Sequence, residues 1–218
     1  MTDVRRWPLA LLAGALGLFT LDPGAVHAFQ DQEAQAEEEE EKSWEDYLPE
    51  NAEVSEGVFT TYFGEDGELF FEIPQEALGK EMMTSIITVE RPGAAGSDGG
   101  TDIVQWDARG TSHVVLRAKN YDQWAEEGSA IDRAVSGMRK GPILHTFEVE
   151  AVSPEGALLI DATPLFLSTQ SELGSLPNVS DDDSFIEKLV AFLRNIEVDF
   201  TQTGRVDNET TTSLLHFS

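Results

Sequence analysis

Alternating apolar and polar positions recur from about residue 58 onward and predict a series of antiparallel β-hairpins. The stretch VFTTYFGEDGELFFEIP (58–74) holds two β-rich runs separated by GEDG, which is typical of a hairpin with a short turn. A second hairpin is expected where TDIVQWDA and SHVVLRA flank Arg109-Gly110. A third is expected between Ile143–Val152 and Ala157–Ala162, across a SPEG turn. The pattern indicates a mostly β fold.

Two further segments are also expected to form strands, and one strand of the third hairpin shows the alternation most clearly. Met82–Glu90 predicts a buried strand, and Ile196 onward alternates apolar and acidic residues as a strand does. In the third hairpin, His145, Phe147 and Val149 alternate with polar residues, which predicts a half-buried strand.

The stretch DDDSFIEKLVAFLRNIEVDF (181–200) predicts the one packed helix, over residues 184–193. Ser184 and Glu187 have the spacing of a capping box. Apolar residues then recur at helical spacing: Phe185, Leu189, Phe192 and Leu193. The expected fold class is therefore mostly β (α+β), with antiparallel β-hairpins in a twisted sheet or sandwich and one packed helix near 184–193.

Three acidic residues, Asp181–Asp183, precede this predicted helix. Acidic side chains at a helix N-terminus interact favourably with its dipole, by about 0.3–1 kcal/mol each. A calcium-binding EF-hand loop does not fit, because Ile186 would stand where glycine is needed and Phe192 where a bidentate Glu is needed. A looser calcium site built from the three aspartates remains the alternative.

The N-terminal 28 residues predict a secretory signal peptide. Arg5 and Arg6 precede an apolar run, Trp7–Phe19, and small residues follow up to a cleavage position near Ala28. An uncleaved membrane anchor is the alternative, although the run is shorter than the roughly 20 residues of a membrane span. We therefore expect an exported bacterial protein, periplasmic or secreted.

Residues 29–56 predict an acidic, disordered linker. They contain twelve acidic residues against the single Lys42, including the run Glu37–Glu41, and few apolar ones. Adjacent like charges repel one another and cannot form a core. The expected organisation is thus a signal peptide (1–28), a linker (29–56) and a β-rich accessory domain (57–218).

Composition excludes several functions. The net charge is −27, so nucleic acids and anionic membrane surfaces would be repelled, and no membrane contact is expected beyond the signal peptide. The chain has no cysteine, which excludes thiol catalysis and cysteine-based zinc sites. A domain of this size can be stable on its hydrophobic core without disulfides.

No recognisable catalytic or metal-binding motif occurs in the sequence. The four histidines are His27, His113, His145 and His216, and none lies in a His-Glu-x-x-His motif. GAAGSDGG (93–100) lacks the Gly-Lys-Ser/Thr of a phosphate-binding loop. We therefore assign no catalytic, cofactor-binding or metal-binding residue in this chain.

Three stretches together resemble a known family. They are GVFTTYFGEDGELFFEIPQEALGKEMM (57–83), GPILHTFEVEAV with LLIDATPLF (141–166), and SFIEKLVAFLRNIEVDFTQT (184–203). They are similar to the N-terminal domain of unknown function of exported bacterial zinc-dependent metallopeptidases of the metzincin-like type.

The resemblance implies the non-catalytic N-terminal portion of such a peptidase, assisting the folding or substrate access of a catalytic domain. That domain would hold the zinc, and it would be the partner of this chain, together with a peptide substrate. We expect the sequence to be truncated before it and the chain alone to be inactive and without a cofactor. The alternative is a stand-alone periplasmic binding or scaffold module without peptidase activity.

Overall fold

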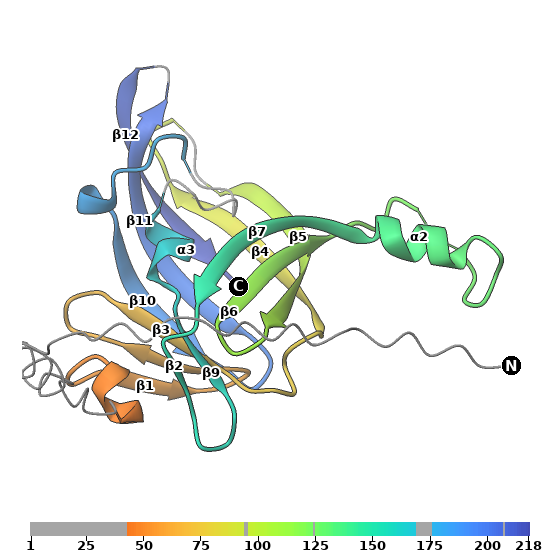
Figure 1. Cartoon of the computed structure of the whole chain (residues 1–218). Coiled ribbons are helices and arrows are strands. Elements are labelled where there is room, and N and C mark those ends of the chain that lie inside the picture. Colours follow the sequence, from red (N-terminus) through yellow and green to blue (C-terminus); the bar gives the residue numbers. More distant parts are fainter. Residues whose placement is uncertain (1–42, 94–95, 124, 169–175, 207) are drawn as a thin grey trace, which may run out of the picture. The chain divides into compact units, whose positions relative to one another are not determined.

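The strands form two antiparallel sheets, drawn as arrows in Figure 1. The computed structural model describes residues 43–93, 96–123, 125–168, 176–206 and 208–218. The expected signal peptide (1–28) and the acidic run Glu37–Glu41 lie outside the described residues. The predicted fold class, mostly β with antiparallel hairpins, is confirmed.

The smaller sheet has five strands in the order β1-β2-β3-β9-β8. Their bounds are β1 Glu53–Glu56, β2 Thr60–Phe63, β3 Leu69–Ile73, β9 Leu158–Asp161 and β8 Ala151–Val152. The larger sheet has seven strands in the order β10-β11-β12-β4-β5-β6-β7. Their bounds are β10 Phe185–Ala191, β11 Ile196–Val206, β12 Glu209–Phe217, β4 Glu81–Glu90, β5 Ser97–Arg109, β6 His113–Lys119 and β7 Lys140–Glu148.

The core lies where the inner face of the curled seven-stranded sheet meets the five-stranded sheet and the short helix α3, Thr163–Leu167 (Figure 1). Phe71 of β3 packs edge-on against Trp106 of β5, with ring centroids 6.4 Å apart. Phe166 of α3 packs against Phe200 of β11 and Phe217 of β12. These rings join both sheets and the helix into one apolar core, and such burial is the main favourable term in folding.

Two of the predicted hairpins are confirmed. Strands β2 and β3 pair across the GEDG turn, with Phe63 opposite Leu69. Strands β5 and β6 pair across Arg109-Gly110, with Arg109 opposite His113. In both, the turn residues predict where the strands begin and end, and the turn then determines the register.

The third hairpin is confirmed only at its turn. Strands β8 and β9 pair across SPEG, with Val152 opposite Leu158. The preceding segment, however, is the separate strand β7, which pairs with β6 in the other sheet. At the break, the Val149 amide donates to Ser112 and the Glu150 amide donates to Leu159, so the chain passes from one sheet to the other.

The helix predicted over residues 184–193 is wrong, because this segment contains strand β10. The Ser184 hydroxyl donates to the Ser180 carbonyl oxygen (2.7 Å) and accepts from the Thr203 amide (3.1 Å). The Glu187 carboxylate accepts from the Thr201 hydroxyl at 2.8 Å. The residues that resemble a capping box therefore bind β11 instead.

The apolar residues that suggested a helical face are mostly exposed, and a β-bulge determines which residues of β10 are buried instead. The pairing of β10 with β11 shifts register between Ile186 and Lys188, which adds one residue to β10. Ile186 and Leu189, three residues apart, consequently stand opposite Phe200 and Val198 of β11. A packed helix does exist, but it is α3.

Order begins earlier than expected. Residues 43–56, which the sequence predicts to be linker, form the 3₁₀ turn η1 (Trp44–Tyr47) and strand β1. Strand β1 pairs with β2, and the Ala191 amide donates to the Ser55 hydroxyl at 3.0 Å. Backbone pairing thus holds a polar strand that has no apolar pattern to reveal it in the sequence.

A segment between β6 and β7 carries the helix α2, Asp132–Met138 (Figure 1). Val135 is its buried residue, whereas Ile131 and Met138 are exposed. Among the described residues, no helix is long and apolar enough to span a membrane.

Candidate functional site

A ladder of charged and amide side chains lies on the outer face of the seven-stranded sheet. Gln105 and Asp107 are alternate residues of β5, and Arg117 and Lys119 are alternate residues of β6. Gln105 stands opposite Arg117 in the register, so all four side chains share one face. The inner face at this point is apolar, with Val104 and Leu116 buried.

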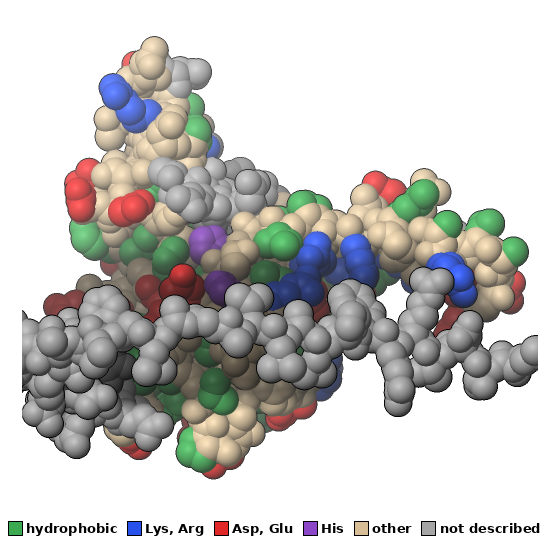
Figure 2. All heavy atoms as spheres, viewed as in Figure 1, with side chains coloured by type: hydrophobic (Ala, Val, Ile, Leu, Met, Phe, Trp, Pro, Cys, Tyr) green, Lys and Arg blue, Asp and Glu red, His purple; other side chains and the backbone are tan. Residues whose placement is uncertain are grey.

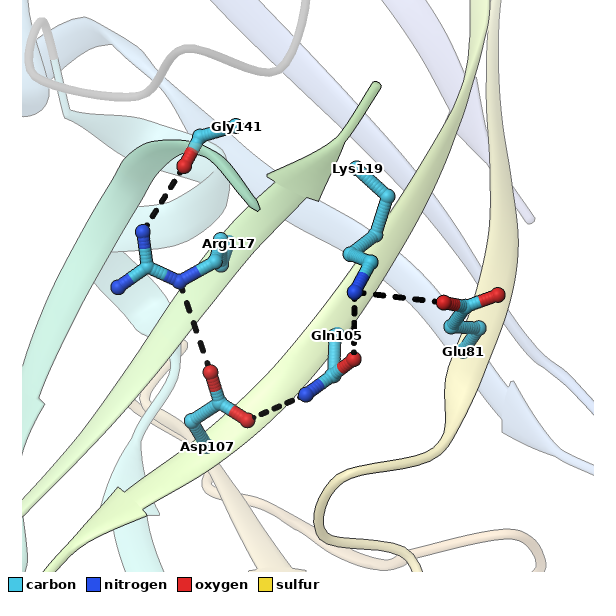
Figure 3. A network of polar contacts seen from close by, with 6 residues as sticks. All are labelled: Glu81, Gln105, Asp107, Arg117, Lys119 and Gly141. Carbon is cyan, nitrogen blue, oxygen red and sulfur yellow. Dashed lines mark hydrogen bonds and ion pairs between the residues drawn. The ribbon is translucent and has the colours of Figure 1, made fainter. Parts of the chain in front are cut away.

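These side chains form one connected network, drawn in Figure 3. The Arg117 Nε lies 3.5 Å from an Asp107 carboxylate oxygen. The Gln105 amide donates to the other Asp107 oxygen at 2.6 Å and accepts from the Lys119 ammonium at 3.1 Å. The Lys119 ammonium also lies 3.3 Å from the Glu81 carboxylate of β4. The network therefore links β4, β5 and β6.

Glu81 marks one end of the network. Its carboxylate accepts a hydrogen bond from the Tyr121 hydroxyl and interacts with Lys119. The Tyr121 hydrogen bond, with a smaller contribution from Lys119, lowers the pKa of Glu81. The same hydrogen bond raises the pKa of Tyr121, since the phenol must keep its proton to donate. Both effects favour the charged carboxylate and the neutral phenol.

Gly141 marks the other end of the network, on β7. The Arg117 guanidinium donates to the Gly141 carbonyl oxygen at 2.8 Å, where the pairing of β6 with β7 is irregular. A Cβ at position 141 would lie only 2.7 Å from the Ala118 carbonyl oxygen. This close approach of two strands requires glycine, which places the carbonyl within reach of Arg117.

A cavity of about 470 Å³ opens beside this network. Its charged lining residues are Asp107, Arg109, Arg117, Lys119 and Lys140. The remaining lining residues are Leu78, Gly79, Gln105 and Ala108. Figure 2 shows Lys and Arg side chains gathered where β7 runs toward α2. Four of the chain's 14 basic residues thus line one cavity in a protein of net charge −27.

An apolar patch lies on the outer face of the same sheet; we call it the outer stripe. It comprises Met83, Ile87 and Val89 of β4, with Ile103 of β5. Met83 stands opposite Ile103 in the register. The exposed fractions are 73% for Met83 and 38–41% for the other three. The outer face of an antiparallel sheet is usually polar, so this stripe is unusual.

The three histidines among the described residues lie on three different strands, and His27 lies outside the described residues. His113 begins β6, His145 lies in β7 and His216 lies in β12. The Nδ1 of His216 is 2.6 Å from an Asp199 carboxylate oxygen on β11. His145 packs on Phe147 with ring centroids 4.4 Å apart, and burial lowers its pKa.

The three aspartates form the 3₁₀ turn η2, Asp181–Asp183, before β10. The Asp183 carboxylate accepts a hydrogen bond from the Ser180 hydroxyl at 2.9 Å. In the part of the chain that the structure describes, no three His, Asp or Glu side chains are grouped as metal ligands.

The polar network was missed at the sequence level, although part of its signal was present. In the predicted hairpin around Arg109-Gly110, each of Gln105, Asp107 and Arg117 stands between two apolar residues. The hairpin register alone brings Gln105 opposite Arg117. The contributions of Glu81 and Gly141 depend on how distant strands pair, which no local pattern indicates.

Comparison with known protein families gives two matches. Residues 96–218 match a domain of unknown function, DUF5117, and residues 41–86 match another, DUF5118. The cavity residues and the network lie mainly in the first match, while Glu81 and Met83 lie in the second. Neither the curated proteins nor the solved structures gave a match.

Proposed function

The chain belongs to the family of the domain of unknown function DUF5117. From the sequence resemblance described above, we propose that it is a non-catalytic accessory module. In this proposal it forms the N-terminal portion of an exported zinc-dependent metallopeptidase and packs against a catalytic domain outside this sequence. The module would assist the folding of that domain or the access of its peptide substrate.

The observation that carries this proposal is the outer stripe. The inner face of the sheet already has its apolar partners in the core, so the stripe is a second apolar surface. Neighbouring apolar side chains on an outer sheet face favour coverage by a partner, because burial stabilises by about 25 cal/mol per Å². A covalently attached catalytic domain is a partner always present at high effective concentration.

The first test concerns the gene. The DNA that follows the codon for Ser218 should encode, in frame or after a frameshift, a domain with His-Glu-x-x-His. The 218-residue chain alone should then hydrolyse no casein or peptide with added zinc, since a catalytic zinc needs about three protein ligands. An unrelated downstream gene would contradict the proposal and favour a stand-alone binding module.

The second test concerns the stripe in the longer protein. Met83→Asp should leave the stability of the 218-residue chain nearly unchanged, because Met83 is 73% exposed, whereas Ile103→Asp should lower it by about 1–2 kcal/mol, because Ile103 is only 38% exposed. In the longer protein each should lower peptidase yield or activity, since a charge would be buried in the domain contact. Val54→Asp is the matched control, because Val54 is 53% exposed but lies on β1 in the other sheet. Equal effects of all three variants would contradict a role for the stripe.

A further inference from the structure

We propose that the cavity beside the polar network is a binding site for a small oxyanion carrying two or more negative charges. Polycarboxylates and phosphates share this chemistry. Arg109 and Lys140 would contact the anion, next to Arg117 and Lys119, whose positions are fixed by the network. The inference does not depend on the proposed function, because a stand-alone module could use the same site.

The cavity is locally positive. Four basic residues and one acidic residue, Asp107, line it, and the Glu81 carboxylate lies 3.3 Å from Lys119, so these six residues together carry a charge of +2 in a protein of net charge −27. Charges farther away than about 8–10 Å are largely screened at physiological ionic strength. An anion inside the cavity therefore interacts mainly with the positive lining.

Two of the four cations are held in place by the protein. The side chains of Arg117 and Lys119 are only 16% and 13% exposed. Arg117 is held by Asp107 and Gly141, and Lys119 is held by Gln105 and Glu81. Their rotamers are thus already ordered, so a ligand would bind them with little further loss of side-chain entropy.

The other two cations have free donors. Arg109 and Lys140 are exposed, and within the described residues neither side chain makes a hydrogen bond or an ion pair. A purely structural network would need only Arg117, Lys119 and their acidic partners. Arg109 and Lys140 are additional to that network, so their N–H donors can bind a ligand.

The size and lining of the cavity indicate the class of ligand. A volume of about 470 Å³ suits a compact molecule rather than an extended polymer. Gln105 supplies an amide, and Leu78, Gly79 and Ala108 leave a small apolar surface. The attraction to the cations and the repulsion by Asp107 both grow with the charge of the ligand, so in a cavity of net positive charge a di- or trianion is attracted more strongly than a monoanion.

The experiment is isothermal titration of the 218-residue chain with citrate and, separately, with inorganic phosphate, at low and at physiological salt. The test variant is Arg109→Gln with Lys140→Gln, which leaves the network of Figure 3 intact. The control is Lys188→Gln with Arg194→Gln, which removes the same charge near β10, at the opposite edge of the sheet.

We expect at least one of the two probes to bind, with an affinity that falls as salt rises. The Arg109/Lys140 variant should bind it roughly tenfold or more weakly, since two charged hydrogen-bond donors are lost. The Lys188/Arg194 variant should bind as the wild type does. Preference for citrate would identify the ligand as a carboxylate, and preference for phosphate would identify a phosphate. Absence of binding to both probes, or equal losses in both variants, would overturn the inference.

Discussion

Two phenylalanines eight residues apart should differ greatly in their contribution to stability. Phe200 of β11 is 2% exposed and packs against Phe166, with ring centroids 5.4 Å apart. Phe192, which the predicted helix would have buried, is 46% exposed in the turn after β10. Its backbone carbonyl accepts from Val58 and its amide donates to Asn195. Alanine would keep both of these bonds.

The magnitudes follow from burial. Phe200→Ala removes a ring from the core and should lower the free energy of unfolding by about 3–5 kcal/mol. Phe192→Ala loses only partial burial of one ring; full burial of such a side chain contributes about 1.5–3 kcal/mol. Since about half of the Phe192 side chain is buried, we expect a loss of about 1–1.5 kcal/mol for Phe192→Ala.

Urea unfolding followed by tryptophan fluorescence measures both changes, because Trp106 lies in the core. The two variants and the wild type should share one m-value, so that the midpoints report stability alone. Losses of similar size in the two variants would refute the reasoning. They would indicate that residues 184–193 pack through Phe192 as the sequence-based helix requires.

Three further predictions concern single residues. Gly141→Ala should destabilise the protein by about 1–3 kcal/mol, because the new Cβ would clash with the Ala118 carbonyl oxygen. In Gly137→Ala, in α2, the new Cβ would have no atom within 4 Å, so this variant should be neutral or stabilising, and equal thermal melts for the two would contradict the prediction. His145 has a pKa below 6.5 in the folded protein, so the unfolded chain binds its proton more readily, and stability should be full above about pH 6.5 and fall as the pH drops below it. Urea titrations at pH 7 and pH 5 should show a steeper loss for the wild type than for His145→Gln, and equal slopes would count against it. Burial and the hydrogen bond to the Glu72 carboxylate raise the pKa of Tyr62 to about 12, so in the native protein its phenol absorbance should change near pH 12. This change should be missing from Tyr62→Phe, and ionisation near pH 10 would disprove the assignment.

The hairpins could be predicted because their information is local. The GEDG and Arg109-Gly110 turns stand between alternating segments, and a short turn determines which residues face each other. The same local reading failed at Ser184 and Glu187, since a hydroxyl and a carboxylate three residues apart serve equally well as helix caps or as partners for a neighbouring strand. Only the presence of β11 beside them decides between these outcomes.

The candidate site could not be predicted from the sequence for a different reason. Its members come from four strands, and Glu81 and Gly141 are 60 positions apart in the chain. Each is an ordinary residue of an ordinary strand when read alone. The cavity exists because the sheet order places β4, β5, β6 and β7 side by side. Sheet order is a global property, and alternation within each strand does not determine it.

The position of β12 within the larger sheet has a consequence for folding. This strand comes late in the chain, yet it lies between β11 and β4, and Ser218 and Ser85 exchange backbone hydrogen bonds across 133 positions. Contacts between residues so far apart require large loops to close before they stabilise anything, which slows folding. Strands β11 and β12 form a local hairpin, so until β12 pairs with β4, these two strands each present an unpaired edge that can associate with other chains. We therefore expect the pairing of β12 with β4 to be a late step of folding, and the protein to be most prone to aggregate before it forms.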